Sequence, residues 1–110
     1  MTARIAYVDD EAELLDVFED YLTELGYRVS TFAHQDDFVV HCNADRPDLC
    51  FMDFRLDGAR GDEVAKQLDA GLKTVLVTGE LSVASDFQFD AVLSKPYRLG
   101  ELHDLINTLL

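Results

Sequence analysis

Residues 48–58 read DLCFMDFRLDG, a short apolar run that ends at the carboxylate Asp53 and is followed by a turn. An apolar run of this length between turn signals is typical of a buried strand in a parallel sheet. Ligands of such sheets bind beyond the carboxyl ends of the strands. Asp53 is therefore expected at the edge of the sheet where a site would form.

Three further strand-like runs also end in polar or charged side chains. They are residues 5–8, followed by Asp9 and Asp10, residues 74–77, followed by Thr78 and Gly79, and residues 91–94, followed by Lys95 and Pro96. If these runs are neighbouring parallel strands, three carboxylates, a hydroxyl and an ammonium group converge. Carboxylate oxygens suit Mg²⁺, and the other two groups can stabilise phosphoryl oxygens. The pattern predicts a site for a divalent metal and a phosphoryl group.

Each of these features has an ordinary structural explanation when taken alone. Adjacent aspartates often cap a helix, and an aspartate or a Thr-Gly pair after a strand often belongs to a turn. Four such features in order, each at the end of a strand, favour a site. The histidines His34, His41 and His103 lack ligand partners at metal-binding spacing, and Cys42 and Cys50 are expected as buried thiols.

The rest of the chain alternates between strand and helix patterns. Strands are predicted at residues 4–8, 28–32, 49–52, 74–77 and 91–94, and helices at residues 10–25, 35–44, 63–68 and 98–110. This alternation predicts an α/β fold whose parallel sheet is covered by helices on both faces. Residues 80–90 show no clean helical period.

The first helix has the clearest boundaries. Asp10 and Glu13 form a start similar to a capping box, and Gly26 is a typical C-terminal signal. The apolar positions at helical spacing, which we predict to be buried, are Leu14, Phe18, Tyr21, Leu22 and Leu25.

The 110 residues are sufficient for a single domain, which we place at residues 1–110. A net charge of −13 argues against nucleic-acid binding, which needs Lys and Arg to neutralise phosphates. No apolar run approaches the length of a membrane helix, and no signal peptide is visible before the first strand. A cytoplasmic protein without membrane or nucleic-acid partners is therefore expected.

The motifs and their order resemble the receiver domain of bacterial two-component response regulators over the whole chain. The matching residues are Asp9, Asp10, Asp53, Gly61, Thr78, Lys95 and Pro96. The resemblance implies a doubly wound, flavodoxin-like sandwich of three layers, with a five-stranded parallel sheet in the order 2-1-3-4-5. It also implies a cis peptide bond between Lys95 and Pro96.

The resemblance further implies phosphoryl transfer to Asp53 from a sensor histidine kinase or a histidine phosphotransfer protein. The implied Mg²⁺ ligands are Asp9, Asp10, Asp53 and the backbone carbonyl of Arg55. The implied phosphoryl-binding groups are Thr78, the N–H of Gly79, and Lys95. Phosphorylation would change a surface that binds a downstream protein, whose identity the sequence does not reveal. Such a chain is not an enzyme beyond its own phosphorylation and dephosphorylation.

The chain departs from the receiver pattern between Thr78 and Lys95, which lie 17 positions apart. This spacing is short for a receiver, so the fourth helix is predicted to be shortened or missing. Val92 stands where receivers usually have a switch aromatic. Candidate replacements are Phe87, Phe89 and Tyr97. The Thr-Gly pair and the shortened helix resemble the FAT GUY subgroup of single-domain receivers.

Arg55 and Glu80 lie two positions beyond Asp53 and Thr78. In receivers these two positions flank the phosphoryl group. Their opposite charges would allow them to pair across the opening of the site. Our hypothesis is that this pair restricts water and tunes the lifetime of the phosphoryl group.

Two other functions are compatible with parts of the sequence, a protein-interaction module and a phosphatase. A receiver fold can act as a protein-interaction module without phosphate, which the altered fourth-helix region favours and the intact set of acids, Thr and Lys disfavours. A phosphatase with an aspartyl-phosphate intermediate needs a second Asp two residues after its nucleophile, where Arg55 stands. The chain is compatible with a stand-alone regulator and with an N-terminal domain of a longer protein.

Overall fold

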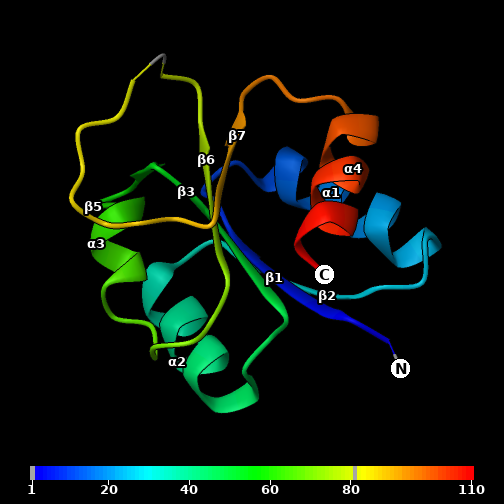
Figure 1. Cartoon of the computed structure of the whole chain (residues 1–110), viewed down its shortest axis with the longest axis horizontal. Coiled ribbons are helices and arrows are strands. Elements are labelled where there is room, and N and C mark those ends of the chain that lie inside the picture. The colour runs from blue at the N-terminus through cyan, green and yellow to red at the C-terminus, as the bar shows by residue number, and fades with distance from the viewer. Residues whose placement is uncertain (1, 81) are drawn as a thin grey trace.

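The computed structural model describes residues 2–80 and 82–110 and shows a parallel sheet between two layers of helices (Figure 1). The strands of this sheet are β1 (Arg4–Val8), β2 (Arg28–Phe32), β3 (Leu49–Asp53), β6 (Thr74–Thr78) and β7 (Ala91–Ser94). The helices are α1 (Ala12–Glu24), α2 (Gln35–Asp45), α3 (Gly61–Ala65) and α4 (Leu99–Leu109). Strands β4 (Arg55–Leu56) and β5 (Ala59–Arg60) form a small antiparallel hairpin.

The sheet has the order β2-β1-β3-β6-β7 with all neighbours parallel. This confirms the predicted order 2-1-3-4-5 and the doubly wound α/β class. Helices α1 and α4 cover one face of the sheet and α2 and α3 cover the other (Figure 1). Each face therefore has its own core, because successive side chains of a buried strand point to opposite faces.

Tyr7 and Phe51 on neighbouring strands pack with Phe18 of α1 in the first core, with ring centroids 4.5–6.2 Å apart. In the second core, Phe38 and Cys42 of α2 lie fully buried, and the burial of Cys42 agrees with the prediction of a buried thiol. This packing fixes β1 and β3 side by side in the middle of the sheet. The carboxyl ends of these two strands therefore occupy a rigid position.

The start of α1 differs from the predicted capping box. The N-cap is Glu11, with no side-chain cap, and Asp10 lies outside the helix. The Asp9 carboxylate accepts a hydrogen bond from the backbone N–H of Glu11 at 2.9 Å. Asp9, and not Asp10, is therefore the aspartate that binds a backbone N–H at the start of α1. On the buried face, Leu15 is buried instead of the predicted Leu25, which is 42% exposed.

The region of the expected fourth helix contains no helix among the residues described there, 82–90. Leu81 lies outside the described residues. Phe87 and Phe89 pack together against the second core, with ring centroids 4.7 Å apart. An irregular segment thus covers the sheet where the helix was expected. This confirms the predicted shortening or loss of the fourth helix.

Helix α3 is shorter and begins earlier than predicted, at Gly61 in place of Glu63. Arg60 holds the start of α3 in place. It forms an ion pair with the buried Asp62 and donates a hydrogen bond to the backbone carbonyl of Ala84. The guanidinium group therefore ties the start of α3 to the irregular segment. The ion pair between Lys66 and Asp86 joins the same two regions at 2.8 Å.

Candidate functional site

The predicted acids meet at the carboxyl ends of β1 and β3. Val8 pairs with Met52 in the sheet, so Asp9 and Asp53 leave neighbouring strands at the same level. One ligand oxygen from each of Asp9, Asp10 and Asp53 lies within 4.8 Å of the others. Asp9 and Asp53 are buried and Asp10 is exposed. The structure therefore brings the three predicted carboxylates together.

Asp9 is fully buried, and its carboxylate accepts three hydrogen bonds. One oxygen, Oδ1, accepts the N–H of Glu11. The other, Oδ2, accepts the Tyr7 hydroxyl at 2.5 Å and the Lys95 ammonium at 3.0 Å. These contacts offset the cost of burying the charge. The sequence analysis did not include Tyr7 among the site residues, although it lies two positions before Asp9 and therefore on the same side of the strand.

Lys95 follows β7 and reaches across the carboxyl ends of the strands. Its Nζ lies 3.0 Å from Asp9 Oδ2, 3.3 Å from Asp53 Oδ1 and 3.6 Å from Glu11 Oε1. Burial works against the charged ammonium, but the hydrogen bond and attraction of Asp9 outweigh it and raise the pKa of Lys95. The peptide bond between Lys95 and Pro96 is cis, as expected.

Asp53 is ionised less easily than an ordinary aspartate. Burial, followed by repulsion from Asp9, raises its pKa to about 6, and Lys95 opposes this rise. One ammonium group thus compensates only part of the negative charge in the cluster. At neutral pH the Asp53 carboxylate is largely ionised and destabilised.

The donor set fits a divalent cation. Mg²⁺ prefers oxygen ligands and binds through a few carboxylates while it keeps several waters. Asp9, Asp10 and Asp53 supply carboxylate oxygens within the required span, and Asp10 is open to solvent. Arg55, whose backbone carbonyl is the fourth expected ligand, follows Phe54 directly beyond β3.

Thr78 ends β6 and is 2% exposed. Its hydroxyl oxygen accepts the N–H of Glu80 at 3.0 Å, and its carbonyl accepts the N–H of Lys95 at 2.7 Å. Thr78 and Ser94 are register partners in the sheet. The hydroxyl therefore lies at the same edge as the acids, where the sequence analysis expected it.

Arg55 and Glu80 form the expected ion pair, with Arg55 Nε 2.6 Å from Glu80 Oε1. The Arg55 side chain is 71% exposed, so the pair lies at the surface. The guanidinium groups of Arg55 and Arg60 both lie over the Phe54 ring, 5.2 and 5.0 Å from its centroid. Gly61 packs closely against the backbone of Phe54. A Cβ atom at position 61 would come within 3.1 Å of Phe54 Cα.

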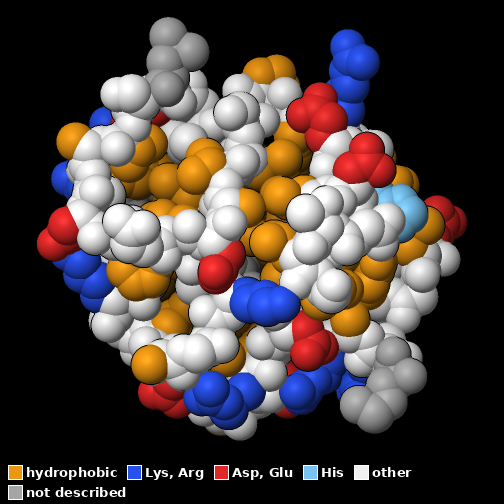
Figure 2. Space-filling model, viewed as in Figure 1, with side chains coloured by type: hydrophobic (Ala, Val, Ile, Leu, Met, Phe, Trp, Pro, Cys, Tyr) orange, Lys and Arg blue, Asp and Glu red, His pale blue; other side chains and the backbone are white. Residues whose placement is uncertain are grey.

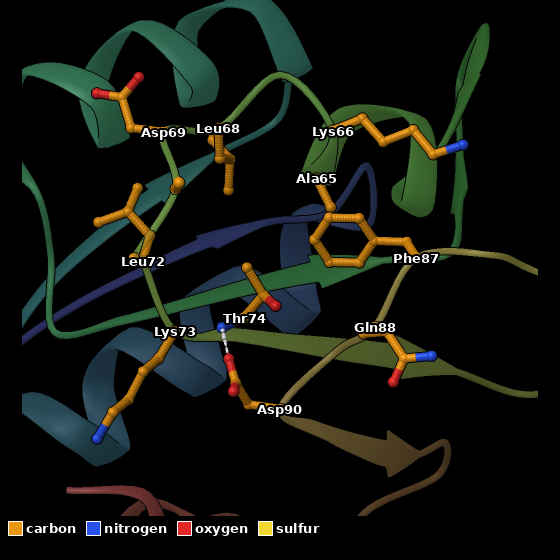
Figure 3. A pocket seen from close by; sticks show the side chains of 12 residues that line it. Ala65, Lys66, Leu68, Asp69, Leu72, Lys73, Thr74, Phe87, Gln88 and Asp90 are labelled. Carbon is orange, nitrogen blue, oxygen red and sulfur yellow. Dashed lines mark hydrogen bonds between the residues drawn. The ribbon is translucent and has the colours of Figure 1, made fainter.

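An open cleft of about 460 Å³ lies at the other end of β6, far along the strand from Thr78. Figure 3 shows Phe87 against Ala65 of α3 in this cleft, and Asp90 accepting the N–H of Thr74. Hydrophobic side chains reach the surface on this side of the molecule (Figure 2), and Val92 of β7 is 57% exposed. The cleft contains none of the predicted site residues.

The comparison with protein families identifies the same class of protein as the motifs of the site. Residues 5–107 match the response regulator receiver domain. The chain therefore belongs to the response regulator receiver family. No helix in the described part of the chain is long and apolar enough to cross a membrane.

Individual relatives are distant but cover nearly the whole chain. The transcriptional regulatory protein BaeR of Escherichia coli is 26% identical over 99% of the chain, and the sporulation initiation phosphotransferase F of Bacillus subtilis is 24% identical over all of it. The chain covers 48% of BaeR and 95% of the phosphotransferase. It therefore spans about half the length of BaeR but nearly all of the second relative.

Solved structures show the same fold. The response regulator TrrA of Thermotoga maritima, solved in complex with Mg²⁺-BeF, is 26% identical with a TM-score of 0.88 over 99% of this chain and 100% of that one. A receiver domain of Methanospirillum hungatei is 27% identical with a TM-score of 0.89 over 98% of this chain and 93% of that one.

Proposed function

We propose that this receiver is a phosphorylation switch of a cytoplasmic two-component system or phosphorelay, with Asp53 as phosphoacceptor. The donor is a sensor histidine kinase or a histidine phosphotransfer protein. The observation that carries the proposal is the contact of the Lys95 ammonium with both Asp9 and Asp53, at the edge of the sheet where β6 ends in Thr78. This is the set of groups that phosphoryl transfer to a carboxylate requires.

The transfer is a substitution at phosphorus. A carboxylate oxygen of Asp53 forms the new O–P bond while the N–P bond to the donor histidine breaks, and the electron pair returns to the imidazole. The nucleophile must be ionised, and a pKa of about 6 leaves Asp53 mostly in that form at neutral pH. Mg²⁺, held by Asp9, Asp10, Asp53 and the Arg55 carbonyl, would supply positive charge to the phosphoryl oxygens.

Three groups of the chain bind the transferred phosphoryl. Lys95 moves from its carboxylate partners toward the new negative charge, and the Thr78 hydroxyl and Gly79 N–H donate to its other oxygens. Thr78 then changes partners, because its hydroxyl oxygen accepts the Glu80 N–H in the unphosphorylated chain. This change at the end of β6 would alter the adjoining surface and recruit a downstream protein.

The test is phosphorylation by acetyl phosphate with and without Mg²⁺, read as intact mass. Wild type and Asp57→Asn, which changes an exposed aspartate in the neighbouring turn, should each gain one phosphoryl group. Asp53→Asn should gain none. Absence of an adduct on wild type in the presence of Mg²⁺ would refute the proposal and favour a module that binds its partner without phosphate. The exposed Val92 beside the irregular segment favours that second function.

We also propose that the ion pair of Arg55 and Glu80 slows hydrolysis of the phosphoryl group. The pair joins the start of β4 to the segment after β6, which follow the strand ends that carry Asp53 and Thr78. In this proposal it lies across the path of an attacking water. Exposed pairs contribute about 1 kcal/mol or less, which limits the expected gain in hydrolysis rate to about fivefold. The double variant Arg55→Ala, Glu80→Ala should lose phosphate faster than wild type. Equal half-lives would dispose of this role.

A further inference from the structure

We infer that Tyr7, supported by Tyr97, is a positioning residue that keeps Asp9 oriented for the divalent cation. This inference rests on the proposed function, since it concerns how the same site is held ready. It starts from the fully buried Asp9, whose oxygen Oδ2 accepts the Tyr7 hydroxyl at 2.5 Å. No other described side chain besides Lys95 donates to this carboxylate.

The two side-chain donors of Asp9 differ in how firmly they are placed. Lys95 also lies near Asp53 and Glu11, and a phosphoryl group on Asp53 would draw the ammonium away. Tyr7 has no such alternative. It is completely buried, and its ring is packed against Phe18 and Phe51. The hydroxyl is therefore the donor that stays on Asp9 throughout the phosphorylation cycle.

Tyr97 provides a second phenol behind the first. It follows Pro96 and packs against the first core, which also contains Tyr7. The single proton of the Tyr7 hydroxyl is donated to Asp9. Tyr97 therefore closes the core near Tyr7 and limits the movement of the Tyr7 ring.

This arrangement determines which part of Asp9 remains free for a cation. Each carboxylate oxygen can accept two hydrogen bonds. Oδ2 accepts both Tyr7 and Lys95, whereas among the described residues Oδ1 accepts only the N–H of Glu11. The remaining acceptor site on Oδ1 is therefore available to the cation or to one of its waters. Without the Tyr7 hydroxyl, Asp9 would be held only by the Glu11 N–H and the movable Lys95 ammonium among the described residues, so its oxygens could exchange roles more easily.

The test is the binding of Mg²⁺ alone, measured by calorimetry on the whole chain without any phosphodonor. Tyr7→Phe retains the ring and removes only the hydroxyl. Loss of a partner that orients a metal ligand weakens binding by 10–100-fold in typical sites, so we expect the Kd for Mg²⁺ to rise about tenfold. The matched control is Tyr21→Phe, which removes the hydroxyl of a phenol whose ring packs on His103 of α4, and its Kd should equal that of wild type.

A double-mutant cycle separates positioning from a general structural effect. If Tyr7 acts through the Asp9 carboxylate, Tyr7→Phe should produce no further loss when added to Asp9→Asn. Tyr97→Leu, which removes the ring that packs on the first core at a partly buried position, provides a milder variant with a smaller rise in Kd if Tyr7→Phe does not fold. Unchanged Mg²⁺ affinity in both phenol variants, or losses that add independently of Asp9, would overturn the inference.

The failure of this inference can be distinguished from failure of the proposed function. Wild-type chain that binds Mg²⁺ and is phosphorylated on Asp53, together with phenol variants of unchanged affinity, contradicts only the role of Tyr7. Wild-type chain that binds no Mg²⁺ contradicts both.

Discussion

Replacement of Asp53 by Asn should stabilise the metal-free protein at neutral pH. The carboxylate is buried beside Asp9, and these two causes raise its pKa to about 6 although Lys95 opposes them. An unfolded chain has no such environment, so its aspartate has a pKa near 4. The folded protein therefore bears a cost for keeping Asp53 ionised, and the neutral amide removes that cost.

The size of this effect follows from the difference between the two pKa values. A rise from about 4 to about 6 corresponds to about 3 kcal/mol of unfolding free energy at pH 7. Between these two values the folded chain binds more protons at Asp53 than the unfolded chain. The contribution of this group to stability therefore falls as pH increases from about 4 to about 6 and is constant above that range.

The assay is urea unfolding with EDTA at pH 4, 5, 6 and 7.5. Asp53→Asn should match wild type near pH 4 and exceed it by about 3 kcal/mol at pH 7.5. Asp57→Asn is the matched control, because it changes an exposed aspartate four positions away. Its curve should follow that of wild type at every pH.

A variant that is no more stable than wild type at pH 7.5 in EDTA would refute this reasoning. A stability difference that is equal at pH 4 and pH 7.5 would refute it as well. Either result would mean that Lys95 fully compensates the Asp53 carboxylate in the folded state.

Three further predictions concern the metal and the surroundings of the site. Mg²⁺ at about one hundred times its Kd should stabilise wild type against urea by about 2.7 kcal/mol, and it should stabilise Asp53→Asn by less. Equal gains in stability would contradict a role for the Asp53 carboxylate in Mg²⁺ binding. Gly61→Ala should cost about 1–3 kcal/mol of stability because its Cβ would collide with the backbone carbonyl of Asp53 at the end of β3. Gly100→Ala, with open space around it, should stabilise α4 by about 0.4–1 kcal/mol, and equal effects of the two substitutions would contradict the close contact. Arg60→Ala should speed amide hydrogen exchange in residues 82–90 more than Lys66→Ala does, because Lys66 contacts this segment through an exposed ion pair. Equal exchange rates in the two variants would show that Arg60 does not hold residues 82–90 in place.

The strands and the residues at their ends were predictable from local patterns, whereas the strand order 2-1-3-4-5 was implied by the resemblance to receiver domains. Apolar runs that stop at polar residues identify strands and their ends, and the ends of parallel strands meet at one edge. Asp9, Asp53, Thr78 and Lys95 could therefore be placed together from the sequence alone. The spacing from Thr78 to Lys95 also left too few residues for an ordinary fourth helix.

The details that the sequence analysis missed depend on tertiary contacts. Asp10 was interpreted as a helix cap, but the buried Asp9 accepts the N–H at the start of α1. The role of Tyr7 was not visible, because an aromatic residue in a strand normally indicates core packing and only the distance to Asp9 reveals its hydroxyl as a donor. Residues 82–90 show no period in the sequence, because their position depends on Arg60 and on packing of Phe87 and Phe89.

The charges of the site suit a divalent cation. The cluster brings the carboxyl groups of Asp9, Asp10 and Asp53 together, and Lys95 is the ammonium group placed among them. Glu11 also lies 3.6 Å from Lys95, so carboxyl groups outnumber the ammonium group, and a divalent cation would reduce this excess of negative charge. Phosphorylation would then add negative charge to Asp53 and draw Lys95 toward the phosphoryl group. Asp9 would keep the Tyr7 hydroxyl and the Glu11 N–H as donors, and these two fixed contacts allow the ammonium to move without leaving a buried carboxylate unpaired.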